Sequence, residues 1–274
     1  MTAGRPQGRR QIRDLLERHS HRPRKRLGQH FLADPNLVER IVRTAAVSPG
    51  DLVVEIGAGT GTLTRALAEA GGRVVAYEID RGLEPVLAET LRGCTVEVRF
   101  EDATRVDLAA ALPGGPWTLV ANLPYNVGTP LLLDVLRHVP QVTRMVVMVQ
   151  RQVADRLTAA PGGKSYGLPS VVAQLHAEVR LGFSVPASVF FPVPDVESAV
   201  VAMARIEPPA MVDRALDLAA AAFNQRRKML RRSLAGALSD AEAVLARAGV
   251  DPAGRAEELE PGAYVRLAEA EVGP

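Results

Sequence analysis

A polar stretch interrupts an apolar segment near the middle of the chain, in the sequence "LVANLPYNVGTPLL". Residues 117–121 have the pattern of a buried strand and residues 129–138 that of an apolar helix. Between them lie Asn122, Leu123, Pro124 and Tyr125. Such a turn can simply cap a strand and cover part of the core. Ligands of open α/β sheets, however, bind at the carboxyl ends of parallel strands, so the turn is also a candidate site.

A glycine-rich turn, "EIGAGTG", directly follows an expected strand over residues 52–56. Glycine at Gly57 allows the backbone to approach a ligand closely and to adopt unusual dihedral angles. Glu78 ends the next expected strand, residues 74–79, where a carboxylate can accept both hydroxyls of a ribose. These features alone would also suit a dinucleotide-dependent oxidoreductase.

Two details favour a different nucleoside ligand. The glycine spacing is G-x-G-x-G rather than G-x-G-x-x-G, and Asp102 follows a third expected strand, residues 95–100. Carboxylates after the second and third strands suit a nucleoside held by its ribose at Glu78 and by its adenine amine at Asp102. We therefore expect S-adenosyl-L-methionine as the cofactor, because its methionine part needs no pyrophosphate cradle.

The elements around these residues alternate between helix and strand from about residue 34 to residue 150. Asp34 and Pro35 cap a helix, and the remaining segments follow the βαβ rhythm of a doubly wound, mainly parallel sheet. Expected helices cover 62–70, 82–92, 129–138 and 151–158, and further strands cover 117–121, 143–149, 178–183 and 198–206. The last two strands are expected to form an antiparallel edge. The fold class is α/β.

Proline at 208 and 209 marks an expected domain boundary, because proline cannot continue a strand. Helices are expected over 211–235, 239–248 and 262–271. We therefore expect a flexible basic extension over 1–23, an α/β domain with the nucleoside site over 24–207 and a small helical domain over 208–274.

The composition indicates a soluble globular protein, with 274 residues, 47% hydrophobic residues and a mean hydropathy of +0.04. No segment has the length and apolarity of a membrane span, and the arginine-rich start does not have the pattern of a secretory signal. Cys94 is the single cysteine, and the five histidines show no close metal-ligand spacing. We expect a cytoplasmic, metal-free, monomeric protein.

Basic residues are concentrated in two places although the net charge is only +2. Residues 1–30 contain nine arginines and lysines against two acidic residues. The second cluster consists of Arg226, Arg227, Lys228, Arg231 and Arg232. Two separate basic patches indicate a polyanionic partner, although a terminal arginine run can also be a solvated tail.

Nine phrases occur together in this order: "RLGQHFL", "EIGAGTGTLT", "EID", "EDA", "NLPYNV", "ADRL", "KSYG", "FFPVPDVESAVV" and "FNQRRKMLRRSL". With these phrases the chain resembles the bacterial small-subunit ribosomal RNA adenine dimethyltransferases over roughly residues 24–265. The related macrolide-resistance methyltransferases act on a large-subunit rRNA adenine. The phrases "NLPYNV", "KSYG" and "QRRKML" are more similar to the former group.

The resemblance implies a Rossmann-like, S-adenosylmethionine-dependent methyltransferase fold and a set of cofactor-binding residues. These are His30, Leu32, Gly57, Glu78, Asp102 and Asn122. Gly57 would face the methionine moiety, Glu78 the ribose and Asp102 the adenine, with Asn122 beside the transferred methyl group. The chain departs from the family pattern at His30, where asparagine is usual, and at Asp195, where lysine is usual.

The resemblance also implies a role for the turn at residues 122–125. The exocyclic N6 of adenine is a poor nucleophile because its lone pair is delocalised into the ring. The side-chain oxygen of Asn122 and the carbonyl of Leu123 can accept its two hydrogens, while Pro124 stiffens the turn. Tyr125 and Phe190 can stack on a base that has left its helix.

The implied activity is N6,N6-dimethylation of two adjacent adenosines in a 3'-terminal hairpin loop of 16S rRNA during ribosome assembly. The partner would be 16S rRNA in the small subunit or its precursor, bound by the basic cluster at 226–232. Two alternatives remain open at this point. One is a resistance-type 23S rRNA methyltransferase, and the other is an RNA-binding assembly factor without catalysis.

Overall fold

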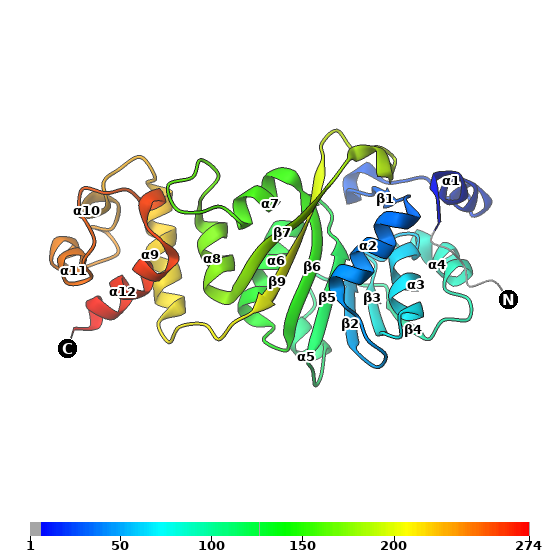
Figure 1. The fold of residues 1–274 in the computed structure, drawn as a ribbon, viewed down its shortest axis with the longest axis horizontal. Helices are drawn as coiled ribbons and strands as arrows, with labels where there is room; N and C mark the ends of the chain where they lie inside the picture. The colour runs from blue at the N-terminus through cyan, green and yellow to red at the C-terminus, as the bar shows by residue number, and fades with distance from the viewer. Residues whose placement is uncertain (1–6, 126, 274) are drawn as a thin grey trace. The chain divides into compact units, whose positions relative to one another are not determined.

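The computed structural model describes residues 7–125 and 127–273, which form two compact units (Figure 1). The first unit comprises the chain up to Ala154 together with Arg180–Ala204, and the second comprises Asp155–Val179 together with the chain from Arg205. This division differs from the expected single boundary at 207/208. Residues 155–179 belong with the C-terminal helices, because helix α8 (Leu168–His176) packs on them.

The core of the first unit is a seven-stranded sheet with the order β4-β3-β2-β5-β6-β9-β7. The strands are β2 (Leu52–Ile56), β3 (Arg73–Tyr77), β4 (Val96–Arg99), β5 (Trp117–Asn122), β6 (Val142–Gln150), β7 (Ala177–Val185) and β9 (Ser198–Arg205). Strands β4, β3, β2, β5 and β6 are mutually parallel, whereas β9 is antiparallel to β6. The predicted doubly wound α/β sheet and the antiparallel pairing of its late strand β9 are thus confirmed.

The central strands are apolar along nearly their whole length because helices cover both faces of a parallel sheet. Strand β2 reads "LVVEI" and is buried from Val53 to Ile56. Its register is fixed on both sides, since Val53 pairs with Val74 of β3 and with Thr118 of β5. This register brings the carboxyl ends of β2, β3 and β5 together at one edge of the sheet (Figure 1).

The helices of the first unit follow the expected alternation with the strands. They are α1 (Arg9–Arg18), α2 (Pro35–Ala45), α3 (Thr62–Glu69), α4 (Glu84–Thr90), α5 (Leu108–Ala111), α6 (Gly128–His138) and the start of α7 (Arg151–Leu157). The predicted cap of α2 is present, because the side chain of Asp34 accepts a hydrogen bond from the amide of Leu37 at 3.0 Å. Helix α2 packs against α3 and β6.

The N-terminal segment is folded from residue 9 onward, which differs from the expected flexible extension over 1–23. Ile12, Leu15 and Leu16 of α1 are buried in the hydrophobic core of the first unit. Their spacing gives α1 one apolar face, and the arginines occupy the other face. The arginine content of the segment concealed this amphipathic pattern.

A second, two-stranded sheet joins distant parts of the sequence. Strand β1 (Phe31–Leu32) pairs antiparallel with β8 (Phe190–Phe191), so that Leu32 lies opposite Phe190. Helix α1 contacts β8, and the guanidinium of Arg9 donates hydrogen bonds to the carbonyls of Ser188 and Phe190. The residues that precede β2 are therefore held against the segment that precedes β9.

The second unit is helical, as expected. Its helices are α8, α9 (Val212–Asn224), α10 (Leu230–Ser233), α11 (Ala241–Arg247) and α12 (Pro261–Val272). The single helix expected over 211–235 is instead two helices with a turn at 225–229 between them. After this turn the amides of Leu230 and Arg231 donate to the carbonyls of Gly254 and Pro252, so the chain pairs with a later loop. Among the described residues, no helix has the length and apolarity to cross a membrane.

Candidate active site

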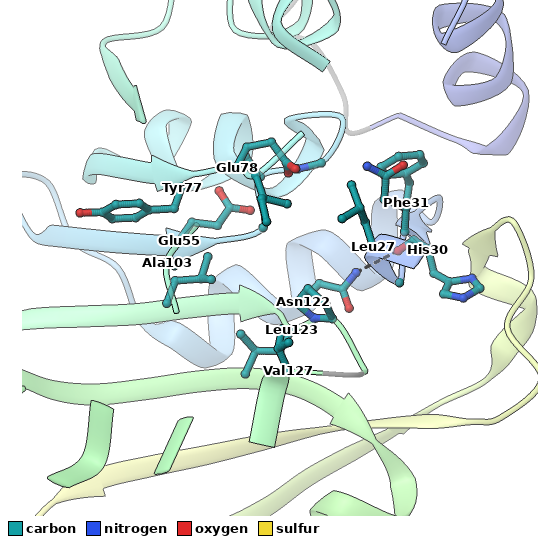
Figure 2. Close-up of a pocket in the computed structure, with 18 of the residues that line it drawn as sticks. Leu27, His30, Phe31, Glu55, Tyr77, Glu78, Ala103, Asn122, Leu123 and Val127 are labelled. Atoms are coloured by element: carbon teal, nitrogen blue, oxygen red, sulfur yellow. Dashed lines mark hydrogen bonds between the residues drawn. The ribbon is translucent and has the colours of Figure 1, made fainter. Parts of the chain in front are cut away.

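A cavity of about 1130 Å³, including its open mouth, lies at the carboxyl ends of β2, β3 and β5. One wall comes from residues 27–32 and the other walls follow the strands, as the labelled side chains in Figure 2 show. The cavity brings together nine of the predicted site residues: His30, Leu32, Gly57, Glu78, Asp102, Asn122, Leu123, Pro124 and Tyr125. These nine predicted residues, which are far apart in the sequence, thus line one cavity.

The glycine-rich turn after β2 is held by the end of β3. The amides of Gly57 and Ala58 both donate to the carbonyl of Tyr77, at 2.8 and 3.1 Å. Gly57 has φ +85°, in the left-handed region that favours glycine, and a Cβ at this position would lie 3.6 Å from the carbonyl oxygen of Asn122. The turn therefore runs directly beside the polar residues that follow β5.

Glu78 is a buried carboxylate that the backbone holds at both oxygens. Its Oε2 accepts from the amide of Gly59 and its Oε1 from the amide of Asp80, each at 2.8 Å. Burial raises the pKa of Glu78, and the two backbone hydrogen bonds oppose that shift. The side chain is therefore fixed in place at the edge of the cavity before any ligand arrives.

Glu55 is a cavity residue that the sequence analysis did not single out. It is 1% exposed, and its Oε2 has no hydrogen-bond partner among the described residues. Burial raises the pKa of Glu55 to about 8, and the nearby charge of Glu78 contributes in the same direction. A carboxylate inside the otherwise apolar strand "LVVEI" was the signal that could have identified it.

Asp102 lies in a tight turn after β4. Its Oδ1 accepts from both the amide and the hydroxyl of Thr104, at 3.0 and 2.7 Å. Arg105 is close to the other oxygen, with 3.6 Å between Nε and Oδ2. The carboxylate is thus oriented by its own turn while it remains on the cavity wall.

The amide of Asn122 has a defined orientation. Its Nδ2 donates to the carbonyl of His30 at 3.0 Å, shown as the dashed line in Figure 2. A carbonyl can only accept a hydrogen bond, so the nitrogen must be the atom that faces His30, and Oδ1 remains available as an acceptor. The following residue is fixed as well, because the amide of Leu123 donates to the carbonyl of Met148 at 3.1 Å.

Tyr125 is held at both its hydroxyl and its ring. The hydroxyl forms a hydrogen bond with Ser198 Oγ at 2.7 Å, and burial raises the pKa of Tyr125. The ring stacks on His30 with 5.6 Å between ring centroids and an interplanar angle of 24°. The Nδ1 of His30 in turn lies 2.9 Å from the carbonyl of Pro192. The histidine that departs from the family pattern therefore supports Tyr125, a contact that the sequence did not indicate.

Phe190 is placed differently from the prediction. Its side chain is fully buried in the hydrophobic core, opposite Leu32 in the β1–β8 pair, and it lies outside the set of described residues that line the cavity. The apolar core retains the ring because solvent exposure would cost its burial free energy. In this structure the Phe190 ring thus belongs to the core and not to the described cavity lining, and its stacking on a base stays a prediction.

The predicted RNA-binding residues occupy the turn at 225–229 and helix α10 of the second unit. Arg227, Lys228 and Arg232 are exposed, whereas Arg226 and Arg231 are half-buried. Arg226 forms an ion pair with Glu257, with 3.0 Å between Nε and Oε2. Arg226 therefore has a structural contact within its own unit, while Arg227 and Lys228 extend into solvent.

The cavity has the chemical character of a site for a cationic nucleoside. Glu55, Glu78 and Asp102 supply three carboxyl groups to a largely apolar cavity, and one oxygen of Glu55 lacks a partner among the described residues. A ligand that carries a positive charge and a ribose would be matched by the carboxyl groups of Glu78 and Asp102. In the part of the chain that the structure describes, no group of three or more histidine, cysteine or acidic side chains could hold a metal ion.

Comparison with known proteins identifies the family. A sequence model of the family described as "Ribosomal RNA adenine dimethylase" matches residues 20–271. The chain belongs to this family. It is an enzyme, an rRNA adenine dimethyltransferase that uses S-adenosyl-L-methionine as its cofactor. This confirms the methyltransferase interpretation over the dinucleotide-dependent and non-catalytic alternatives.

Individual proteins are similar to this chain along most of its length. The "Ribosomal RNA small subunit methyltransferase A" of Kineococcus radiotolerans is 47% identical over 271 residues, which cover 94% of this chain and 89% of the relative. The crystal structure of the 23S rRNA methyltransferase ErmE is 28% identical, with a TM-score of 0.70 and coverage of 88% and 99%. A dimethyladenosine transferase from Plasmodium falciparum has the same fold, with 24% identity, a TM-score of 0.77 and coverage of 87% and 96%.

Proposed function

We propose that this enzyme dimethylates N6 of two adjacent adenosines in a 3'-terminal hairpin loop of 16S rRNA during assembly of the small ribosomal subunit. Two observations favour the small subunit over the large one. The relative from Kineococcus radiotolerans, at 47% identity, is named for the small subunit, whereas the 23S rRNA methyltransferase ErmE is 28% identical. The phrases "NLPYNV", "KSYG" and "QRRKML" point the same way.

The observation that carries the proposed chemistry is the orientation of the Asn122 amide. Because Nδ2 donates to the carbonyl of His30, Oδ1 is free to accept a hydrogen bond from the N6 amine. Oδ1 and the carbonyl of Leu123 would each accept a hydrogen bond from one N6 hydrogen. These two hydrogen bonds would draw the nitrogen towards tetrahedral geometry and localise its lone pair. Preorganised acceptors at a reacting centre contribute this kind of electrostatic stabilisation without reorganisation.

The cofactor would bind along the ends of β2, β3 and β4. Glu78 would accept the ribose hydroxyls, Asp102 the adenine amine, and the turn at Gly57 would face the methionine part. S-adenosyl-L-methionine supplies an activated methyl group on a sulfonium centre. The chain's own residues then serve to orient N6 in line with that group and to exclude water, and no covalent enzyme intermediate is needed.

A neutral amide at position 122 suits two successive methyl transfers. The first transfer would form the N6–CH3 bond, and the nitrogen would then release one proton to solvent. N6 would retain only one hydrogen, so one acceptor would lose its donor. A desolvated carboxylate without a donor would be more costly than an amide oxygen in the same position. Asn122 is therefore better suited than an aspartate to holding a monomethylated amine for the second step.

Target recognition would combine stacking with phosphate contacts. Tyr125 lines the cavity and offers an aromatic ring to a base that has left its helix. Arg226, Arg227, Lys228, Arg231 and Arg232 would contact the RNA backbone. We further propose that the enzyme works as a cytoplasmic monomer, which sedimentation at several protein concentrations would check.

One experiment tests the proposed target. The enzyme is incubated with labelled S-adenosyl-L-methionine and, separately, with unmodified small subunits, unmodified large subunits and the two naked rRNAs. The expected result is dimethyladenosine in the 3'-terminal part of 16S rRNA and little label in the large subunit. Label that appears mainly in 23S rRNA would overturn the proposal in favour of the resistance-type activity.

A further inference from the structure

A second carboxylate, Asp80, lies two residues beyond Glu78 and is as deeply buried. Its side chain is 0% exposed and is surrounded by donors. Arg24 Nη1 lies 2.7 Å from Oδ1, Gln29 Nε2 donates to Oδ2 at 2.8 Å, and the amide of Gly82 donates to Oδ1 at 2.9 Å. Two of these three donors come from the segment of residues 21–29, which we call the N-terminal strap.

The strap packs tightly around Asp80. The side chain of His21 is 4% exposed, with 3.8 Å between its Nε2 and Asp80 Oδ2. A Cβ added at Gly82 would lie 3.0 Å from Asp80 Oδ1 and 3.2 Å from Arg24 Nη2. Steric space and charge pairing thus both specify how the strap fits against the turn after β3.

The same cluster is connected to the cofactor site from two directions. The backbone amide of Asp80 donates to Glu78 Oε1 at 2.8 Å, which fixes the proposed ribose carboxylate. On the other side, Leu27, Gly28 and Gln29 of the strap form part of the cavity wall. Within the strap, the backbone amide of Arg24 donates a hydrogen bond to Gln29 Oε1 at 2.8 Å.

The cost of burying the Asp80 charge favours a strap that stays packed against Asp80. A fully buried carboxylate is costly unless it is paired and hydrogen-bonded, and removal of one partner leaves that cost uncompensated. Arg24 is the cation that lies against Asp80, and its own side chain is 44% exposed. Loss of the strap would therefore leave Asp80 without its ion pair beside Glu78, which is itself a carboxylate.

We propose that Asp80 is a positioning residue for the cofactor site, which holds Glu78 and the N-terminal strap in one hydrogen-bonded unit. Through Asp80, the cavity wall at residues 27–29 and the Glu78 carboxylate at the edge of the cavity are placed together. Asp80 does not touch the cofactor in this arrangement and acts through Glu78 and Gln29. The inference rests on the proposed role of Glu78, but it does not depend on which rRNA is the target.

The test uses the full chain and three substitutions that disturb the unit by different means. Asp80→Asn removes the charge, Arg24→Gln removes the cation, and Gly82→Ala inserts a methyl group into the cluster. Each should raise the dissociation constant of S-adenosyl-L-methionine by about tenfold, the scale of one lost hydrogen bond to a charged group. Arg24→Lys keeps the cation and should restore most of the affinity.

A second readout distinguishes positioning from general destabilisation. Trypsin cleavage after Lys25 and Arg26, which are exposed on the strap, should accelerate in the three variants and slow again when cofactor is saturating. At saturating cofactor, kcat should stay within about threefold of the parental value while KM for the cofactor rises.

The matched control is Glu89→Gln, which breaks the pairing of Glu89 with Arg18, at the end of helix α1, and with the next residue, His19, without touching Asp80. It should leave cofactor affinity unchanged. Parental affinity in Arg24→Gln and Gly82→Ala would overturn the proposal, even if Asp80→Asn fails to fold. Cofactor binding is measured without RNA, so an incorrect rRNA assignment would not be mistaken for failure of this inference.

Discussion

The cavity of the first unit and the basic turn of the second unit use charge in opposite ways. In the cavity, Glu55 and Glu78 are buried, and Glu78 is held by two backbone amides. In the turn, Arg227 and Lys228 are exposed, and water reaches the charged ends of their long side chains. The first arrangement fixes a few polar groups before the ligand arrives, whereas the second supplies a diffuse positive field.

This difference predicts two kinds of mutational response. Substitution of a buried, preorganised group should weaken ligand binding or transition-state stabilisation strongly, and salt should have little effect on that loss. An exposed cation contributes little individually, adds to its neighbours and is screened by salt. The following experiments test that contrast from its largest expected effect to its smallest.

Asn122→Ala should have the largest effect on catalysis. It removes the oriented acceptor for N6, and the single-turnover rate of methyl transfer should fall about 100-fold or more, with RNA affinity retained. The measurement uses saturating cofactor and RNA and scores mono- and dimethyladenosine separately. Tyr125→Phe is the control, because it keeps the ring, loses only the hydrogen bond to Ser198 and should retain much of the activity. Parental rates for both transfers in Asn122→Ala would show that the turn has no catalytic role.

Glu78→Ala should weaken cofactor binding by about 2 kcal/mol, the scale of charge-assisted hydrogen bonds to the ribose. The free energy of unfolding should also decrease, because the amides of Gly59 and Asp80 lose their acceptor. Calorimetric titration with S-adenosyl-L-methionine measures the first effect and urea unfolding the second. Glu69→Gln, on the exposed side of α3, is a control that should leave cofactor affinity unchanged. Unaltered cofactor affinity in Glu78→Ala would contradict the assignment of Glu78.

Glu55 predicts a pH dependence of stability. Its pKa is about 8 in the folded protein against an ordinary value of 4.5, so between these values the folded state holds a proton that the unfolded state has lost. The free energy of unfolding should therefore decrease as the pH rises through this window, by at most about 1.4 kcal/mol per pH unit from this one group. Urea unfolding from about pH 5 to about pH 8 measures the slope.

Glu55→Gln should flatten this pH dependence. A residual slope of the same sign is expected from Glu78, whose pKa is also raised by burial. An identical slope in the parental protein and in Glu55→Gln would mean that Glu55 is already ionised in the folded state.

The basic turn should give the smallest and most salt-dependent effect. Arg227→Gln combined with Lys228→Gln should reduce the slope of log affinity for RNA against log salt by up to about 2, with cofactor affinity unchanged. Filter binding at several salt concentrations measures it. Arg226→Gln is the informative comparison, because it also breaks the ion pair with Glu257 and should lower the thermal stability as well. An unaltered salt slope in the double variant would exclude the turn from RNA binding.

The sequence predicted those parts of the fold whose patterns are local. The alternation of apolar strands and helices located β2 to β6, and the polar residues at the strand ends located the cavity. The N-terminal helix was missed because its arginines dominate the composition, while only Ile12, Leu15 and Leu16 carry the apolar face. The break at 225–229 depends on hydrogen bonds to residues 252–254, which no local pattern encodes.

The sequence indicated which residues line the cavity but not which hydrogen-bond partners orient their side chains. Asn122 and Glu78 were identified from their positions after strands, yet the partners that orient them, His30 and the amides of Gly59 and Asp80, come from other segments. Phe190 was assigned to the site on a resemblance, but its burial follows from the β1–β8 pair across the chain. Local sequence indicates which groups are available, whereas tertiary contacts decide which atoms are left free.

The strand order has a consequence for how the chain is made. Strand β9 lies between β6 and β7 in the sheet, although β7 precedes it in the sequence. During synthesis, β7 therefore leaves the ribosome with no neighbour to pair with until β9 has followed it. Before that moment the apolar strand β6 is an open edge, where another nascent chain could pair. The sheet can be completed only after residue 205 has been translated.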